Sequence, residues 1–131
     1  MTRLSFSVCI FIAVVASGCS TTEDIAANSV GHSETFQTNA RALSACVLTE
    51  LSAQERGYAF RRIITKSTIV IEAQLASAAD TPGEFVEFQL EFSADNNART
   101  LVSVRSNQTV WGDPTYPDTV WPAVQQCANI S

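Results

Sequence analysis

Two carboxylates, Glu87 and Glu91, come nearest in type and spacing to an acid and base for hydrolysis. They lie in a segment that alternates apolar and polar residues, as a strand with one buried face does. At about 3.3 Å per residue, a strand separates their Cα atoms by roughly 13 Å. The two carboxyl groups of a glycosidase lie roughly 5 to 10 Å apart. The spacing therefore favours a solvated charged face over a hydrolytic site.

The chain lacks the other common patterns of catalytic and metal-binding residues. It has no Gly-x-Ser-x-Gly segment, and His32 is its only imidazole. Asp95-Asn96-Asn97 is similar to the opening of a calcium loop, but Arg99 stands where the next oxygen ligand belongs. We therefore expect a turn at residues 95–97, and we expect no metal site, no cofactor and no enzymatic activity.

Large aromatic residues gather near the C-terminus. Trp111, Tyr116 and Trp121 lie within a short segment that also contains prolines, which cannot continue a sheet. Such a loop can present aromatic rings to a partner surface. It can equally close the open end of a thin core, because a small domain needs large side chains to exclude water. The lid is the favoured role of the three aromatic residues, and a binding surface is the alternative.

Composition limits the class of protein. The chain has 131 residues, of which 46% are hydrophobic, and a net charge of −5. The length and the apolar content fit one small globular domain. The negative charge disfavours a nucleic-acid partner, which requires a concentrated basic surface.

The N-terminus has the pattern of a secretory signal peptide. Arg3 precedes an uncharged apolar run over residues 8–16, which is shorter than the roughly 18 to 20 residues of a spanning helix. Ser17 and Gly18 follow it, and small residues suit cleavage by a signal peptidase. Residues 1–18 are therefore predicted to be removed.

The residues Ala16-Ser17-Gly18 directly before Cys19 resemble the lipobox of bacterial lipoproteins. This resemblance implies that the signal is cut before Cys19, whose thiol and new amino group carry acyl chains that bind the membrane. Ser20, in place of Asp, implies the outer membrane, with the domain facing the periplasm. A soluble secreted product cut nearby is the alternative.

Two cysteines remain in the mature chain once Cys9 leaves with the signal and Cys19 takes the lipid. In an oxidising compartment Cys46 and Cys127 most simply pair with each other. Two buried free thiols are the alternative. A metal site is disfavoured, because His32 lies away from both cysteines in the sequence and no Cys-x-x-Cys occurs.

The mature chain is predicted to begin with a flexible tether over residues 19–33, in which His32 is solvated. Apolar residues then recur every three or four positions from Glu34 to about Arg56, which predicts one long helix. Residues 120–128 predict a short closing helix with Pro122 in its first turn. That helix would bring Cys127 to Cys46.

Four strands are predicted between the helices, at residues 58–64, 68–75, 84–93 and 100–104, because β-branched and aromatic residues there alternate with polar ones. A three-residue loop at 95–97 would place Leu90 opposite Val102, Phe88 opposite Val104, and Glu87 opposite Arg105. The face of the sheet away from the helices is predicted to be solvated and of mixed charge. It would display Arg61, Glu72, Glu87, Gln89, Glu91, Arg99 and Arg105.

The predicted fold class is α+β: a long N-terminal helix packed on a four-stranded antiparallel meander, with a short C-terminal helix and one disulfide. Residues 34–131 would form this single domain. The expected function is that of a small membrane-anchored lipoprotein, a non-enzymatic binding or assembly module for an envelope protein. The alternatives are a structural lipoprotein without a discrete ligand and, third, an enzyme acting on an envelope polymer.

Overall fold

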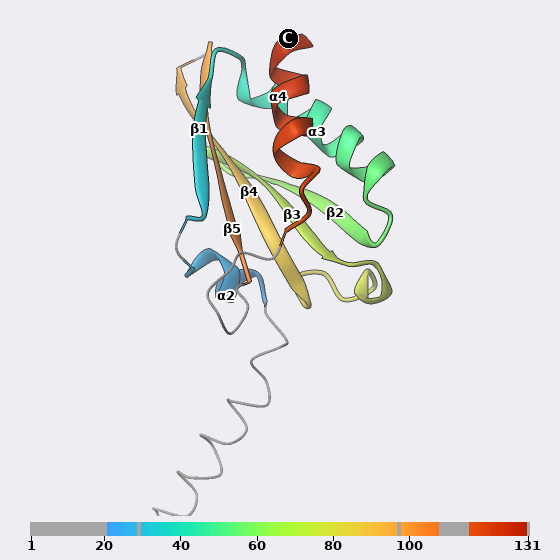
Figure 1. Cartoon of the computed structure of the whole chain (residues 1–131). Helices are drawn as coiled ribbons and strands as arrows, with labels where there is room; N and C mark the ends of the chain where they lie inside the picture. The colour runs from blue at the N-terminus through green and yellow to red at the C-terminus, as the bar shows by residue number, and fades with distance from the viewer. Residues whose placement is uncertain (1–20, 29, 97, 108–115, 131) are drawn as a thin grey trace, which may run out of the picture.

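The computed structural model describes residues 21–28, 30–96, 98–107 and 116–130. Figure 1 shows an antiparallel sheet with long helices on one face and a short helix at one end. The helices are α2 (Thr22–Ala26), α3 (Ala40–Gln54) and α4 (Val120–Ile130), with a 3-10 turn η2 (Ala76–Ala78). The strands are β1 (His32–Phe36), β2 (Tyr58–Ile64), β3 (Thr68–Leu75), β4 (Val86–Asn96) and β5 (Arg99–Ser106).

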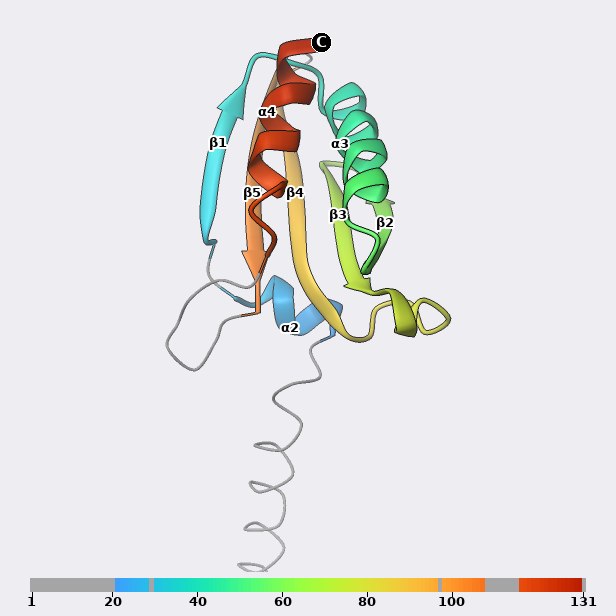
Figure 2. The same ribbon diagram turned by 45° about the vertical axis from the view of Figure 1, so that its right-hand side comes forward.

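The core lies between the sheet and the pair α3 and α4, which Figure 2 shows side by side over the strands. Alternate residues of β4 point into it, because successive side chains of a strand face opposite sides. On α3 the buried apolar residues lie three or four positions apart, on one face of the helix. The residues with fully buried side chains include Leu43, Val47, Leu51, Phe88, Leu90, Phe92, Val102, Val104 and Val124.

The sheet has five strands, in the order β1-β5-β4-β3-β2, so the prediction of four was wrong. The additional strand β1 pairs with β5 and takes up residues that were expected in the tether and in the first helix. Within β1, Glu34 and Phe36 are half-buried and alternate with exposed residues, which is the pattern of a strand, although Phe36 also fits a helical period. The helix α3 begins after Asn39, whose side chain accepts hydrogen bonds from the backbone N–H groups of Arg41 and Ala42.

The hairpin of β4 and β5 has a different register from the predicted one. Leu90 lies opposite Val104 and Phe92 opposite Val102, a shift of two residues that keeps the same side chains on the buried face. The shift arises at the turn, where a bulge after Ala94 lets Asn96 pair with Arg99. The hairpin loop is therefore tighter than three residues, and Glu87 does not face Arg105.

A disulfide joins Cys46 of α3 to Cys127 of α4, with the two Cα atoms 5.7 Å apart. This distance lies within the range that a disulfide spans without displacement of the backbone. Cys127 is fully buried, and α4 runs two residues beyond the predicted end, to Ile130. The bridge thus ties the two helices to each other above the sheet.

Among the described residues, no helix is both long and apolar enough to cross a bilayer. Two predicted site residues, Cys19 and Trp111, lie outside the described residues.

Candidate functional site

Helix α2 covers one end of the outer face, the side of the sheet away from α3 and α4. Its N-cap Thr21 and Asp24 form a capping box, in which each side chain bonds the backbone N–H of the other residue. Thr22 N–H donates to the carbonyl of Gly83 at 3.0 Å, and Ile25 is fully buried. The described part of the predicted tether is therefore folded against the domain. The pattern Thr-x-x-Asp is the sequence signal for this helix.

A buried carboxylate lies under α2. Glu72 on β3 has no exposed surface, and its Oε2 accepts a hydrogen bond from Arg61 Nη2 at 2.8 Å. Its other oxygen accepts from the hydroxyl of Thr22. The side chain of Gln89 on β4 donates to the carbonyl of Thr22 at 3.1 Å. These four residues, Thr22, Arg61, Glu72 and Gln89, are called the α2 latch below.

The prediction of a uniformly solvated outer face is wrong at the α2 latch. Glu72 and Gln89 were expected in water, but α2 covers both of them. A buried charge is tolerated only when it is paired and hydrogen-bonded, and Arg61 and Thr22 provide those bonds to Glu72. Beside α2, Arg105 Nη1 lies 3.5 Å from Glu91 Oε2, and both of these side chains are half-buried.

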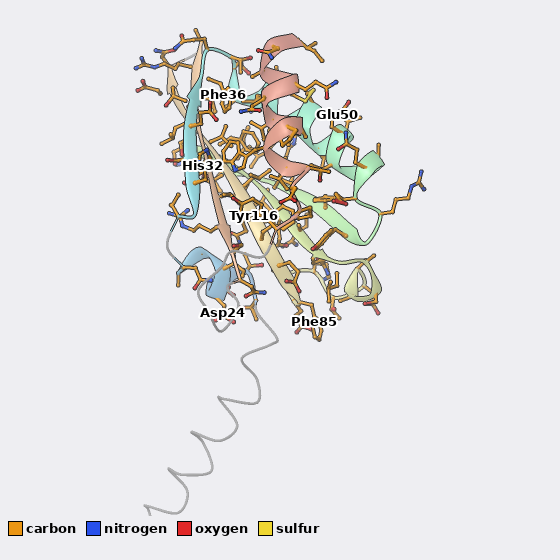
Figure 3. All side chains as sticks on the ribbon, in the orientation of Figure 1. Asp24, His32, Phe36, Glu50, Phe85 and Tyr116 are labelled. Atoms are coloured by element: carbon orange, nitrogen blue, oxygen red, sulfur yellow. A yellow bond between two sulfur atoms is a disulfide. The ribbon has the colours of Figure 1, made fainter. Side chains whose placement is uncertain are left out.

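The segment between β3 and β4 completes this end of the molecule. Gly83 has φ +88 and Phe85 has φ +53, both in the left-handed region, which Phe rarely adopts. The N–H of Leu75 donates to the carbonyl of Phe85 at 3.2 Å, so these two residues are neighbours. Phe85 and Leu75 are 39% and 37% exposed. Figure 3 shows Phe85 at the same end of the fold as Asp24 of α2.

Two of the three predicted aromatic site residues pack against the core. Trp121 lies edge-on to His32, with ring centroids 4.4 Å apart, and stacks on Phe36 at 6.5 Å. Tyr116 lies beside Phe88, with ring centroids 6.2 Å apart. Both side chains are half-buried, and the third residue, Trp111, lies outside the described residues. His32 is exposed, but it belongs to β1 and contacts Trp121, whereas a position in a flexible tether is what the sequence predicts.

The edge strand β2 carries half-buried apolar residues and two arginines. It pairs with β3 alone among the described strands, and Ile64 at its end is 47% exposed. Arg62 points to the helix side, where its Nη1 donates to the hydroxyl of Ser44 at 3.4 Å. Burial, Glu87 and Glu55 raise the pKa of Tyr58, at the start of the strand. An edge position thus accommodates the arginines that interrupt the alternation of β2.

The remaining sequence-predicted positions do not converge on one site. Asp95 and Arg99 form an ion pair at the tight turn between β4 and β5. The described residues contain no cluster of three or more metal-ligating side chains. A hollow of about 190 Å³ lies between the start of α3 and the β2–β3 turn, where Arg41 and Lys66 are at its rim.

The residues that sequence reasoning missed are Thr22, Leu75 and Phe85, which the fold brings to one end of the molecule together with Glu72. The Thr-x-x-Asp pattern points to the helix that holds Thr22. No sequence pattern reports the conformation of Phe85, because a positive φ at that position depends on the surrounding fold. No protein-family model matches this chain, and no curated protein sequence is similar to it.

Proposed function

We propose that this chain is a small outer-membrane lipoprotein, held by an acylated Cys19, whose domain faces the periplasm as a non-enzymatic binding or assembly module. The observation that carries the proposal is the position of Cys19, directly after an apolar run and three small residues. The disulfide between Cys46 and Cys127 supports it, because such bridges persist in oxidising compartments.

The binding surface that we propose is the outer edge of β2. An edge strand offers backbone N–H and C=O groups to which an extended peptide can add as a further strand. Ile64 supplies exposed apolar surface there, and Arg62 supplies positive charge, whereas the charge of Arg61 is already paired with Glu72. The partner that fits is an extended segment of an envelope protein with apolar and acidic side chains. The packed positions of Tyr116 and Trp121 make them weaker candidates than this edge.

Acylation is tested by the substitution Cys19→Ala. We expect the variant to accumulate as an unprocessed precursor, because it removes the thiol that takes the first acyl chains. The wild-type protein should fractionate with the outer membrane and show the mass of an acylated chain that begins at Cys19. An unlipidated wild-type product that begins at another residue would refute the proposal.

Binding at the β2 edge is tested by photo-crosslinking in cells. A photoreactive amino acid at Ile64 should give a discrete adduct with one envelope protein, whereas the same amino acid at Thr49, on the exposed face of α3, should give none. The variant Arg62→Glu should weaken the adduct at Ile64, since it reverses the charge at the edge. Equal adducts at Ile64 and Thr49, or no adduct at Ile64, would contradict a binding role for β2.

A further inference from the structure

The end of the fold that carries α2 also carries an exposed apolar pair. Leu75 and Phe85 are adjacent through a backbone hydrogen bond, and more than a third of each residue is exposed. The left-handed φ of Phe85 is unfavourable for a residue with a Cβ, and such conformations are concentrated at functional sites. Large apolar side chains kept in this way at one end of a domain indicate a contact with an apolar surface.

The part of the chain immediately after Cys19 is fixed to this same end of the domain. Thr22 is bonded to Gly83 and to Glu72, so the chain joins the folded domain at this residue. Three residues of fully extended chain span at most about 11 Å, which is therefore the greatest distance from Cys19 to Thr22. Whatever surface holds Cys19 must lie within that reach of α2.

We infer that the end formed by α2, Leu75 and Phe85 rests directly against the lipid surface that holds the acyl chains of Cys19. Leu75 and Phe85 contact the boundary between headgroups and acyl chains, and the α2 latch keeps the connection short. The inference rests on the acylation proposed above. The inference also orients β2 relative to the membrane. Tyr58 pairs with Leu75, so the edge strand begins at the end of the domain that faces the lipid.

The charges at this end indicate what holds the domain in place. Four carboxylates, Glu23, Asp24, Asp80 and Glu84, lie on α2 and in the segment from Leu75 to Phe85. They outnumber the two arginines beside that segment, Arg56 and Arg61, and Arg61 is paired with Glu72. Carboxylates are repelled by an anionic lipid surface. The short connection to Cys19 and the apolar pair, not charge attraction, therefore bring this end to the bilayer, and a zwitterionic bilayer is the lipid that suits it.

The test measures the depth of single labelled positions in the acylated, full-length mature protein. Phe85→Cys and Lys66→Cys are each labelled with a thiol-reactive fluorophore and reconstituted into phosphatidylcholine vesicles that contain nitroxide-labelled lipid. Lys66 lies beyond the opposite end of β3, about 30 Å away along the strand at 3.3 Å per residue. We expect several-fold stronger quenching at residue 85 than at residue 66. Equal quenching at the two positions would overturn the inference.

A spacer separates the short connection from other causes of quenching. Ten Gly and Ser residues inserted between Ser20 and Thr21 add a coil of roughly 17 Å and leave the α2 latch intact. Quenching at residue 85 should then fall to the level of residue 66. Undiminished quenching with the spacer would contradict the role of the short connection.

The mass of each reconstituted protein keeps this inference distinct from the proposed function. Loss of the acyl mass would refute the acylation of Cys19, and the inference with it. Equal quenching at residues 85 and 66 in a protein of full acyl mass would refute the inference alone.

Discussion

Reduction of the disulfide between Cys46 and Cys127 is expected to lower the free energy of unfolding by about 2 to 5 kcal/mol. The bridge has a sequence separation of 81 residues, and the cross-link of such a long loop restricts the unfolded chain strongly. A domain of this size has a net stability of roughly 5 to 15 kcal/mol, so the loss is a large fraction of it. Urea denaturation with and without reductant measures the difference directly.

Helix α4 should respond to reduction before the sheet does. Its buried residues Val120, Ala123, Val124 and Cys127 form a narrow stripe. A helix of this length is marginal without tertiary support. Hydrogen exchange should therefore quicken over Val120–Ile130 in the reduced protein while β3 and β4 stay protected. Unchanged protection of α4 would show that packing alone holds this helix.

The meander was predictable from the sequence because each strand has a strong local pattern. Residues 58–64 and 68–75 form β2 and β3 with the predicted bounds, and β4 shows the expected alternation with Phe88 buried. A strand with one face in the core has an apolar residue at every second position, so its alternation can be read directly from the sequence. The register between β4 and β5 was not predictable in the same way, because a bulge at Ala94 changes it without changing which face is buried.

The elements that sequence reasoning missed depend on contacts distant in the chain. The five residues of β1 form a strand because β5 offers an edge, and Phe36 fits a helical period equally well. Helix α2 has too few residues to be stable alone and depends on the sheet beneath it. The alternation of β3 indicates on which face of the sheet Glu72 lies, but not whether another element covers that face. The sequence therefore predicts a solvated Glu72, whereas α2 covers it.

The α2 latch is expected to depend on the charge of Glu72. The substitution Glu72→Gln keeps the shape of the side chain but removes the negative charge that bonds Arg61 and Thr22. We expect it to lower the free energy of unfolding by about 2 to 3 kcal/mol, the range for a lost hydrogen bond to a charged group in a buried site. The loss is not greater, because Arg61 is 43% exposed and can be hydrated when its partner is neutral.

The matched control is Glu91→Gln on the neighbouring strand. Glu91 also pairs with an arginine, Arg105, but its side chain is 35% exposed, and we expect a change of at most about 1 kcal/mol. The two variants are compared by urea denaturation and by hydrogen exchange over Thr22–Ala26, which should quicken in Glu72→Gln alone. A Glu72→Gln protein no less stable than Glu91→Gln, with α2 still protected, would mean that burial of Ile25 holds α2 without the latch. The domain would then keep its short connection to Cys19 by apolar packing rather than by the buried carboxylate.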